Sequence, residues 1–366
     1  MIRQSDIEAL ERLDSRGALV LSAYLDLDPA RHARRTYRIA FEDLTRELRE
    51  KLAKPGRAAL EREAERVTQW LETQKPQGKG LALFASAPRQ LWQAHWLAVR
   101  VPDHAAFEPL PDLAPLLDAL DEYERYAVAL ADREHARLFT VFMGEIEEGD
   151  ELEDSLVRRD DAHVLHLQRV ARRLAELSRR RHFDRLILAG PEEAAHELRR
   201  RLPRALASRL VAVIPLAMDA SAKEILEKTL AVERLAERDF EQRLLDELIE
   251  QSGPAGRAIH GISPTLAALW AREVHTLVAA ERTHVEGSEC PSCGRLEKGA
   301  VERCPACGEK MEPMHDLFHR ALTEALRQSA KVDVVHGEAA RRLIEVGQGL
   351  GALLRFRVPV DLDSGR

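Results

Sequence analysis

Apolar and polar positions along this chain fall into blocks that predict strands and amphipathic helices. In the first third, strand-like apolar runs occupy residues 18–28, 80–86 and 91–101. Two charged stretches with helical periodicity, residues 36–53 and 57–73, lie between the first two runs. We therefore expect a sheet whose first two strands are connected by a helical hairpin.

The middle of the chain combines a strand hairpin with alternating helices and strands, which is typical of an α/β domain with a mixed sheet. Apolar runs at residues 126–132 and 135–143 predict the hairpin, and the acidic stretch 144–160 is expected to be a loop. The next helix is predicted from an apolar stripe at helical spacing, formed by Leu167, Val170, Leu174 and Leu177. Beyond it we expect strand 185–190, helix 192–201, strand 210–215 and helix 224–251.

A third region follows this long helix. We expect strands at residues 272–281, 331–336 and 348–356, with a helix at 316–329 between the first two. A chain of 366 residues exceeds what one hydrophobic core usually organises, so we expect two or three domains.

Composition narrows the class of protein. The chain is 45% hydrophobic with a net charge of −7, which suits globular domains and argues against binding nucleic acid over the whole surface. No apolar run reaches the length of a membrane span, and the first residues lack the pattern of a signal peptide. We therefore expect a cytoplasmic protein.

The four cysteines of the chain form two Cys-x-x-Cys pairs, each followed by a glycine. This spacing lets four thiolates bind one Zn²⁺ ion tetrahedrally, and the glycines permit tight turns. Two disulfides are the alternative, although cytosolic thiols are normally reduced, and a redox motif needs one pair only. With four protein ligands the metal has a structural role. The predicted ligands are Cys290, Cys293, Cys304 and Cys307.

Positive charge is concentrated in the middle region. Residues 155–211 hold fourteen arginines and seven acidic residues. Arginine binds phosphate in a bidentate manner, so this stretch favours contact with RNA, and an ordinary solvated surface is the alternative. Histidines in such a stretch are more often packed or merely exposed than stacked on bases. The predicted RNA-binding residues are Arg158, Arg159, His163, His166, Arg169, Arg172 and Arg173.

The order of elements around the cysteines carries a family resemblance. A strand precedes the ribbon, and a helix, a short strand and the terminal segment Gln348-Gly-Leu-Gly-Ala-Leu-Leu-Arg-Phe356 follow it. This order resembles the third domain of the archaeal and eukaryotic class-1 peptide release factors and Pelota. The resemblance implies a mixed α/β (α+β) fold with three domains in release-factor order, at residues 1–122, 123–252 and 253–366. It also implies a zinc ribbon inserted in the third domain at about residues 287–312.

The two functional motifs of the release factors are missing. The codon-reading Asn-Ile-Lys-Ser motif cannot be present, because the chain contains no asparagine. Where the family presents Gly-Gly-Gln, residues 158–168 lack a glycine pair, and Gln168 falls within a predicted helix. Gly347-Gln348-Gly349 lies at the start of the last strand instead. P-loop, metalloprotease and nucleophile-elbow motifs are absent too, so we assign no catalytic residue.

The resemblance implies a translation factor that binds the ribosome without catalysis. Within the family the functional analogy is with Balon-type ribosome hibernation factors, which resemble Pelota and occupy the ribosomal A site without reading a codon. The implied partners are the rRNA of both subunits at the A site and an elongation-factor GTPase such as EF-Tu. A peptidyl-tRNA hydrolase or ribosome rescue factor with a non-standard loop is the enzymatic alternative. An RNA-binding stress protein that never enters the ribosome is the third.

Overall fold

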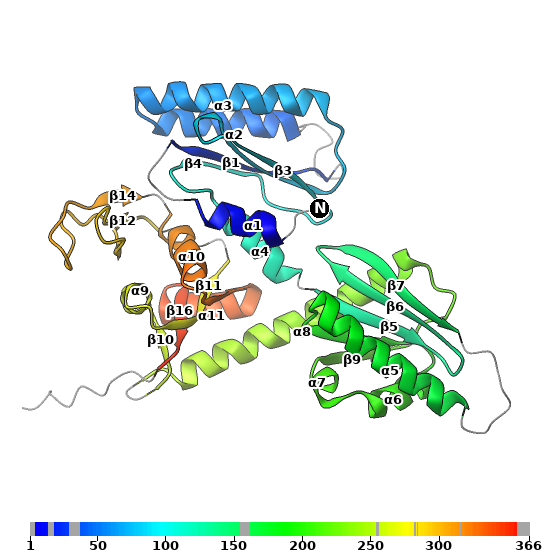
Figure 1. Cartoon of the computed structure of the whole chain (residues 1–366). Coiled ribbons are helices and arrows are strands. Elements are labelled where there is room, and N and C mark those ends of the chain that lie inside the picture. The colour runs from blue at the N-terminus through cyan, green and yellow to red at the C-terminus, as the bar shows by residue number, and fades with distance from the viewer. Residues whose placement is uncertain are drawn as a thin grey trace, which may run out of the picture. The chain divides into compact units, whose positions relative to one another are not determined.

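The structure is a computed structural model that describes residues 4–13, 18–28, 37–123, 125–153, 162–253, 256–281, 283, 285–314 and 316–356. The fold is mixed α/β, as the sequence predicts (Figure 1). The chain divides into two compact units, the first made of Met1–Asp121 and Arg238–Arg366, the second of Glu122–Glu237. Each of the three regions expected from the sequence holds a sheet of its own, while the boundaries of three domains remain a prediction.

The N-terminal part of the first unit is an antiparallel sheet in the order β3-β2-β1-β4, covered on one face by two helices (Figure 1). Leu21, Leu25 and Leu83 pack beneath Phe41 and Leu60 of these helices. The strands are β1 (Val20–Asp26), β2 (Gly80–Ser86), β3 (Leu91–Leu97) and β4 (His104–Glu108). The helices are α1 (Gln4–Glu11), the covering pair α2 (Tyr37–Lys51) and α3 (Lys54–Thr73), the short η1 (Ala87–Arg89), and α4 (Ala114–Glu122).

The second unit is a five-stranded mixed sheet in the order β7-β6-β5-β8-β9, between two layers of helices. Side chains alternate along β5 because strand residues point to opposite faces. Ala127 and Ala129 pack with α5 and α6, whereas Val128 and Leu130 pack on the side of α8. The elements are β5 (Tyr126–Ala131), β6 (His135–Phe142), β7 (Glu145–Glu153), α5 (Ala162–Arg181), β8 (Arg185–Ala189), α6 (Glu192–Arg201), α7 (Arg204–Ala207), β9 (Leu210–Ile214) and α8 (Ala222–Glu250).

Strand β7 occupies a stretch that the sequence predicts to be a loop, so that prediction was wrong. Its sequence, EIEEGDELE, is rich in carboxylates and has low strand propensity. The strand nevertheless pairs antiparallel with β6 along its length, and Ile146 and Leu152 pack against the two cores of the unit. Acidic side chains suit an edge strand, because they discourage pairing with another chain.

The C-terminal part of the first unit is a sheet in the order β10-β16-β11-β15, with helices on both faces. Leu277 and Ala279 of β11 pack with α9 and α10, and Val278 and Ala280 pack with α8 and α11. Helices α9 and α11 and strand β10 were not among the predicted elements. The elements are β10 (Ala258–His260), α9 (Ile262–Trp270), β11 (Val274–Ala280), α10 (Leu317–Arg327), β15 (Lys331–Val335), α11 (Gly337–Gly347) and β16 (Leu350–Leu354).

A small three-stranded sheet is inserted between β11 and α10, where the sequence predicts the ribbon. Its order is β13-β12-β14, with β12 (Gly287–Glu289), β13 (Leu296–Lys298) and β14 (Glu312–Met314). The nearly buried guanidinium of Arg320 joins it to α10, because Nε and Nη2 donate to the two carboxylate oxygens of Glu289 at 3.0 and 2.8 Å. In the described part of the chain, no helix combines the length and hydropathy needed to cross a membrane.

Candidate functional site: a four-cysteine centre and a basic helical face

The four cysteines meet at the end of the inserted sheet. Their sulfur atoms all lie within 4.8 Å of one another, and the Sγ atoms of Cys290 and Cys307, Cys293 and Cys304, and Cys293 and Cys307 are 3.4, 3.6 and 3.7 Å apart. These separations exceed a disulfide bond of about 2.05 Å. Four sulfurs placed tetrahedrally at about 2.3 Å from one Zn²⁺ ion would be about 3.8 Å apart. The arrangement therefore fits a single tetrahedral metal ion better than two disulfides.

Each Cys-x-x-Cys pair is held by the same main-chain hydrogen bonds. In the first pair, the amide of Gly294 donates to the carbonyl of Cys290 at 2.9 Å, and the amide of Gly308 donates to Cys304 at 2.9 Å in the second. Both glycines have positive φ, 70° and 76°, a region that other residues enter at a cost. The glycines after each pair therefore have the role that the sequence predicts for them.

The four thiols lie close enough to shift one another's pKa values in opposite directions: burial and neighbouring thiols raise the pKa of Cys293 to about 12, whereas the pKa of Cys304 falls. Cys290 and Cys304 are buried, whereas Cys293 and Cys307 are exposed. Burial raises the pKa of the Cys304 thiol, but amides of Cys307 and Ala306 that donate to it, together with neighbouring thiols, outweigh burial and lower the pKa to about 7. A bound cation neutralises thiolates that would otherwise repel one another.

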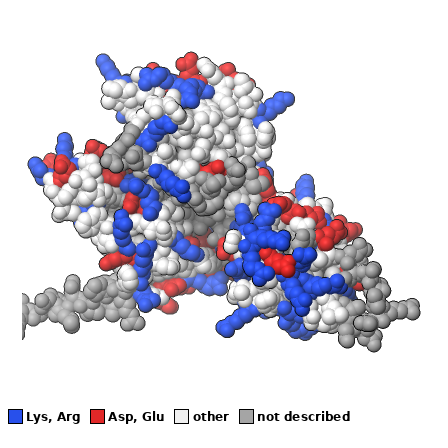
Figure 2. Space-filling view, viewed as in Figure 1, with Lys and Arg blue, Asp and Glu red and all other residues white. Residues whose placement is uncertain are grey.

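A second candidate site is the outer surface of the second unit. On α5, the side chains of Leu167, Val170 and Leu174 are fully buried, as the predicted stripe requires. The arginines between them point outwards, and α6 contacts α5 and adds two more. Figure 2 shows Lys and Arg side chains gathered over these two helices. We call this surface the basic face and define it by Arg169, Arg172, Arg173, Arg179, Arg180, Arg199 and Arg200.

The arginines of the basic face differ in how they are paired. Arg173 forms an ion pair with Glu176 at 2.8 Å. Arg172, Arg179 and Arg180 are exposed and form no ion pair with another residue that the structure describes. Because no described residue neutralises their charge, these three are the arginines best placed to bind an external anion.

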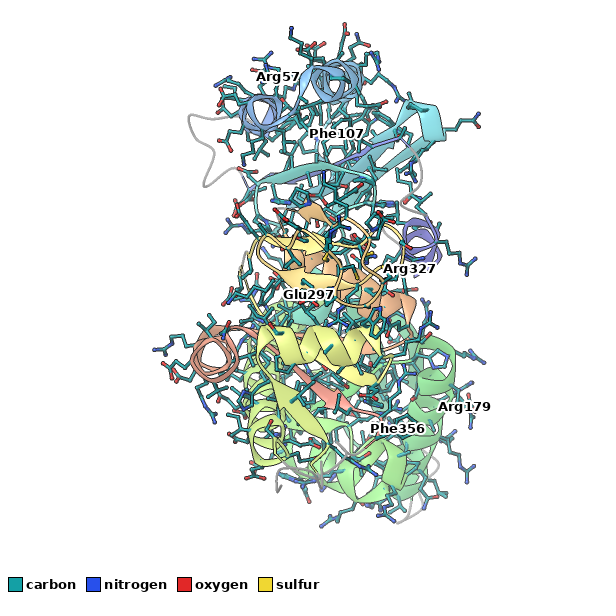
Figure 3. The ribbon with its side chains drawn as sticks, turned by 90° about the vertical axis from the view of Figure 1, so that its left-hand side faces the viewer. Arg57, Phe107, Arg179, Glu297, Arg327 and Phe356 are labelled. Carbon is teal, nitrogen blue, oxygen red and sulfur yellow. The ribbon has the colours of Figure 1, made fainter. Side chains whose placement is uncertain are left out.

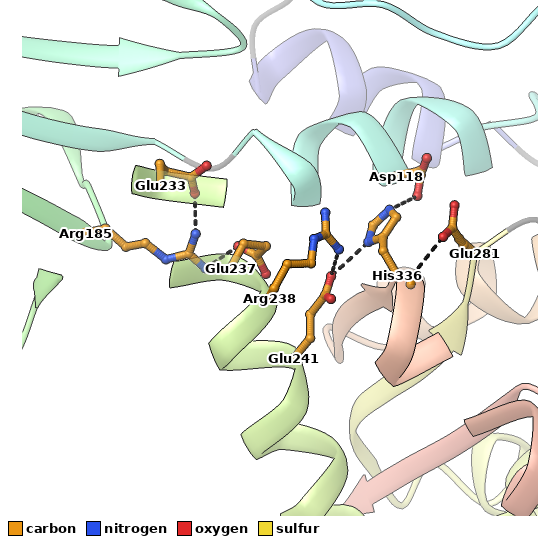
Figure 4. A network of polar contacts seen from close by, with 9 residues as sticks. Asp118, Arg185, Glu233, Glu237, Arg238, Glu241, Glu281 and His336 are labelled. Atoms are coloured by element: carbon orange, nitrogen blue, oxygen red, sulfur yellow. Dashed lines mark hydrogen bonds and ion pairs between the residues drawn. The ribbon is translucent and has the colours of Figure 1, made fainter. Parts of the chain in front are cut away.

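Some arginines counted in the sequence are structural instead. Arg185, at the start of β8, has a side chain only 9% exposed and forms ion pairs with Glu233 and Glu237 of α8 (Figure 4). Arg209 donates to Ser178 Oγ at 2.7 Å and to the carbonyl of Phe183 at 2.8 Å. A count over the sequence therefore overestimates the charge that this unit presents to a ligand.

The predicted histidines and the first two predicted arginines have different outcomes. His163 is 39% exposed, and its Nε2 lies 3.7 Å from Glu197 Oε1. His166 is only 1% exposed, on the buried side of α5 next to Leu167, so its ring is not accessible to RNA. We therefore remove it from the candidate RNA-binding residues. Arg158 and Arg159 lie outside the described residues.

Two histidine–carboxylate clusters in the first unit have no signal in the sequence. Asp112 Oδ1 lies 2.8 Å from His319 Nδ1, and Asp112 Oδ2 lies 2.6 Å from His104 Nε2. His336 places its ring nitrogens 2.8 Å from Glu241 and 2.9 Å from Asp118 (Figure 4). An imidazolium can donate to two carboxylates at once. These partners are far apart in the sequence, so no local pattern announces them.

Comparison with protein families identifies the segment that holds the basic face. Residues 111–234 match the model of the family described as Bacterial archaeo-eukaryotic release factor family 10. Over this segment the chain is similar to the bacterial relatives of the archaeo-eukaryotic release factors. The resemblance predicted from the sequence is thereby confirmed. No curated protein sequence matches the chain.

Solved structures similar to the chain include two archaeal proteins and a yeast protein. The archaeal translation termination factor aRF1 is 16% identical, with 96% of each chain covered and a TM-score of 0.27. Pelota of Archaeoglobus fulgidus is 16% identical, with 78% of this chain and 82% of that chain covered and a TM-score of 0.36. S. cerevisiae Dom34, a translation termination-like factor that interacts with Hbs1, is 9% identical, with 76% and 80% covered and a TM-score of 0.46.

The glutamine that comes nearest to the position where release factors present Gly-Gly-Gln lies inside a helix. Gln168 is an exposed residue of α5 (Ala162–Arg181). Its backbone is helical and hydrogen-bonded within α5, so it does not form the glycine-flanked turn that brings Gly-Gly-Gln to an ester. Residues 154–161, which precede the helix, lie outside the described residues.

Proposed function

We propose that the protein is a non-enzymatic translation factor that binds the ribosome, and that it acts as a hibernation factor by occupying the A site. The proposal is supported most directly by the coincidence of two segments of the chain. The segment that matches the release-factor family, residues 111–234, is the segment that carries the basic face. Delivery by an elongation-factor GTPase such as EF-Tu, and a structural Zn²⁺ ion in the four-cysteine centre, belong to the same proposal.

Electrostatics supports RNA as the ligand of the basic face. The whole chain carries a net charge of −7, yet exposed arginines gather on α5 and α6. Each phosphate that an arginine neutralises releases a counterion, so binding of this kind weakens steeply as salt rises. The acidic remainder of the surface discourages RNA elsewhere, which focuses contact on one face.

We propose no catalytic activity, because the residues that could supply it are held in other roles. Gln168 is held in α5, and we assign no nucleophile or general base to the second unit. The four cysteines supply a complete ligand set, so a Zn²⁺ ion bound there has no open position for substrate. Occupancy of the ribosome, and not turnover, is therefore the activity that we propose.

Binding to vacant bacterial ribosomes tests the proposal. Arg172 and Arg179 lie two helical turns apart on one side of α5, and neither pairs with another described residue. Replacing both by glutamate should weaken ribosome binding by about tenfold or more, which is about 1.4 kcal/mol, and should reduce the salt dependence of the affinity. The matched control is Lys223→Glu with Lys228→Glu on α8, which changes the net charge equally in the helical layer on the other side of the sheet.

The control should bind ribosomes like the unmodified protein, and A-site tRNA should compete with both while P-site tRNA should not. Repeating the measurement with EF-Tu and GTP tests delivery. Normal binding by the Arg172→Glu, Arg179→Glu variant, or indifference to A-site tRNA, would show that the basic face is a solvated surface and would remove the basis for A-site occupancy.

A further inference from the structure

A groove lies along the free edge of the N-terminal sheet. Its volume is about 500 Å³, and the five residues of β4, His104 to Glu108, form one wall. In the described part of the chain β4 pairs only with β1, so it is the last strand of its sheet on this side. Main-chain N–H and C=O groups on the outer side of such a strand are available to a further strand.

The opposite wall is a row of leucines on α2 and its C-terminal end. Leu44, Leu48 and Leu52 recur every four residues, so they lie on one side of the helix, and each is only partly buried. Phe107 of β4 points to the same side and lies beneath α2 and α3 in Figure 3. The row spans about 12 Å at 1.5 Å per residue, which matches four extended residues at about 3.3 Å each. The groove therefore has the dimensions of a short strand.

The described charged residues around the groove are mainly acidic. Glu47 and Glu286 are exposed, and Glu108 and Asp316 are partly exposed. Lys51 is the exposed cation of the lining, while His104 and His319 are already paired with Asp112. An occupant that carries positive charge is therefore favoured over an acidic one.

We propose that this groove is a docking site for an extended, positively charged segment of a partner protein, which adds to the sheet as a strand next to β4. Side chains alternate along a strand, so those of one parity meet the leucines of α2 and should be apolar. Those of the other parity meet the side of Glu286 and Asp316 and should be basic. The proposal does not depend on ribosome binding, which we assign to the second unit.

The probe is a short fluorescent peptide of alternating lysine and valine residues, added to the full-length protein. Binding is measured by fluorescence anisotropy, and hydrogen exchange of the His104–Glu108 amides is measured with and without the peptide. Two further peptides are N-methylated, one at every lysine and the other at every valine. Strand addition places the N–H groups of one parity against β4, so one methylated peptide should lose binding and the other should keep it.

Charge reversal identifies the site. Glu47→Lys combined with Glu286→Lys should weaken peptide binding by about tenfold. The matched control, Glu50→Lys combined with Glu302→Lys, changes two exposed glutamates that do not line the groove and should bind normally. A glutamate–valine peptide should not bind.

Protection of β4 amides together with loss of binding for one methylated peptide establishes the docking site. Equal binding by both methylated peptides would show mere adsorption and overturn the proposal, as would absence of binding. A peptide with the sequence of residues 357–366 could also bind with the same protection of β4 amides and the same sensitivity to N-methylation. The occupant would then be this chain's own C-terminal segment. A dimer in sedimentation that the lysine–valine peptide dissociates would make a second copy the occupant. Either result would overturn the assignment to a partner protein.

Discussion

Replacing Asp112 by asparagine should remove most of the pH dependence of stability of the first unit between pH 6.5 and pH 9. The carboxylate of Asp112 is buried between His319 and His104. Burial by itself lowers the pKa of His319, but the facing carboxylate outweighs burial and raises the pKa from 6.5 to about 9. The pKa of His104 is raised as well, because its contact with Asp112 outweighs burial.

The sign and size of the effect follow from these values. A histidine whose pKa is raised on folding binds its proton more tightly in the native state, so its stabilisation is complete below pH 6.5 and is lost as pH rises to 9. A shift from 6.5 to about 9 corresponds to roughly 3 kcal/mol at 1.36 kcal/mol per unit. His104 adds to the loss in the same direction. The affinity of the four thiols for a metal ion changes with pH in the opposite direction. Metal binds to deprotonated thiolates, which become more abundant as pH rises.

Urea unfolding of the full-length protein at pH 6, 7.5 and 9 measures the effect. Tryptophan fluorescence reports on the first unit alone, because all four tryptophans belong to it. The free energy of unfolding of the unmodified protein should fall by roughly 3 kcal/mol across this range. Asp112→Asn should be less stable at pH 6 and should show a much smaller decline, because neutral His319 then costs little. The surface control Asp43→Asn should follow the unmodified protein.

Two results would refute this reasoning. A free energy of unfolding that stays constant from pH 6.5 to 9 would mean that His319 is neutral in the folded protein. A full decline in Asp112→Asn would mean that other groups, such as Glu108 or Asp316, retain the proton on His319.

The remaining predictions concern the metal and catalysis. The purified protein should contain about one Zn²⁺ per chain, and Cys304→Ser should lower both the metal content and the melting temperature of the first unit, because structural metal supplies folding free energy. Elemental analysis and calorimetry check this, and undiminished stability after complete chelation would contradict it. Ribosomes that carry peptidyl-tRNA should release no more peptide with the protein than with buffer. Release that disappears on Gln168→Ala would instead favour the peptidyl-tRNA hydrolase.

Local sequence was informative wherever the environment of a residue is set by its neighbours along the chain. The buried stripe of α5 and the insertion of the ribbon were predicted correctly. The acidic strand β7 was missed, because its formation depends on pairing with β6 and not on its own composition. The prediction that His166 binds RNA was wrong, because helical periodicity places this residue on the buried side of α5. It lies beside Leu167 on the buried side, whereas Arg169 and Arg172 lie on the exposed side.

The sequence by itself determined the mixed α/β class, the convergence of four cysteines and the concentration of arginine in the middle region. Each of these features depends on residues within a short stretch of the chain. The spacing of those residues fixes the local geometry, and their composition fixes the local charge. Only the tertiary structure decided which arginines form internal ion pairs and that Asp112 contacts His319. It also decided that β4 is the last strand of its sheet and lies beside a row of leucines. Such features arise from contacts between residues that are distant in the chain, and a local sequence pattern does not predict those contacts.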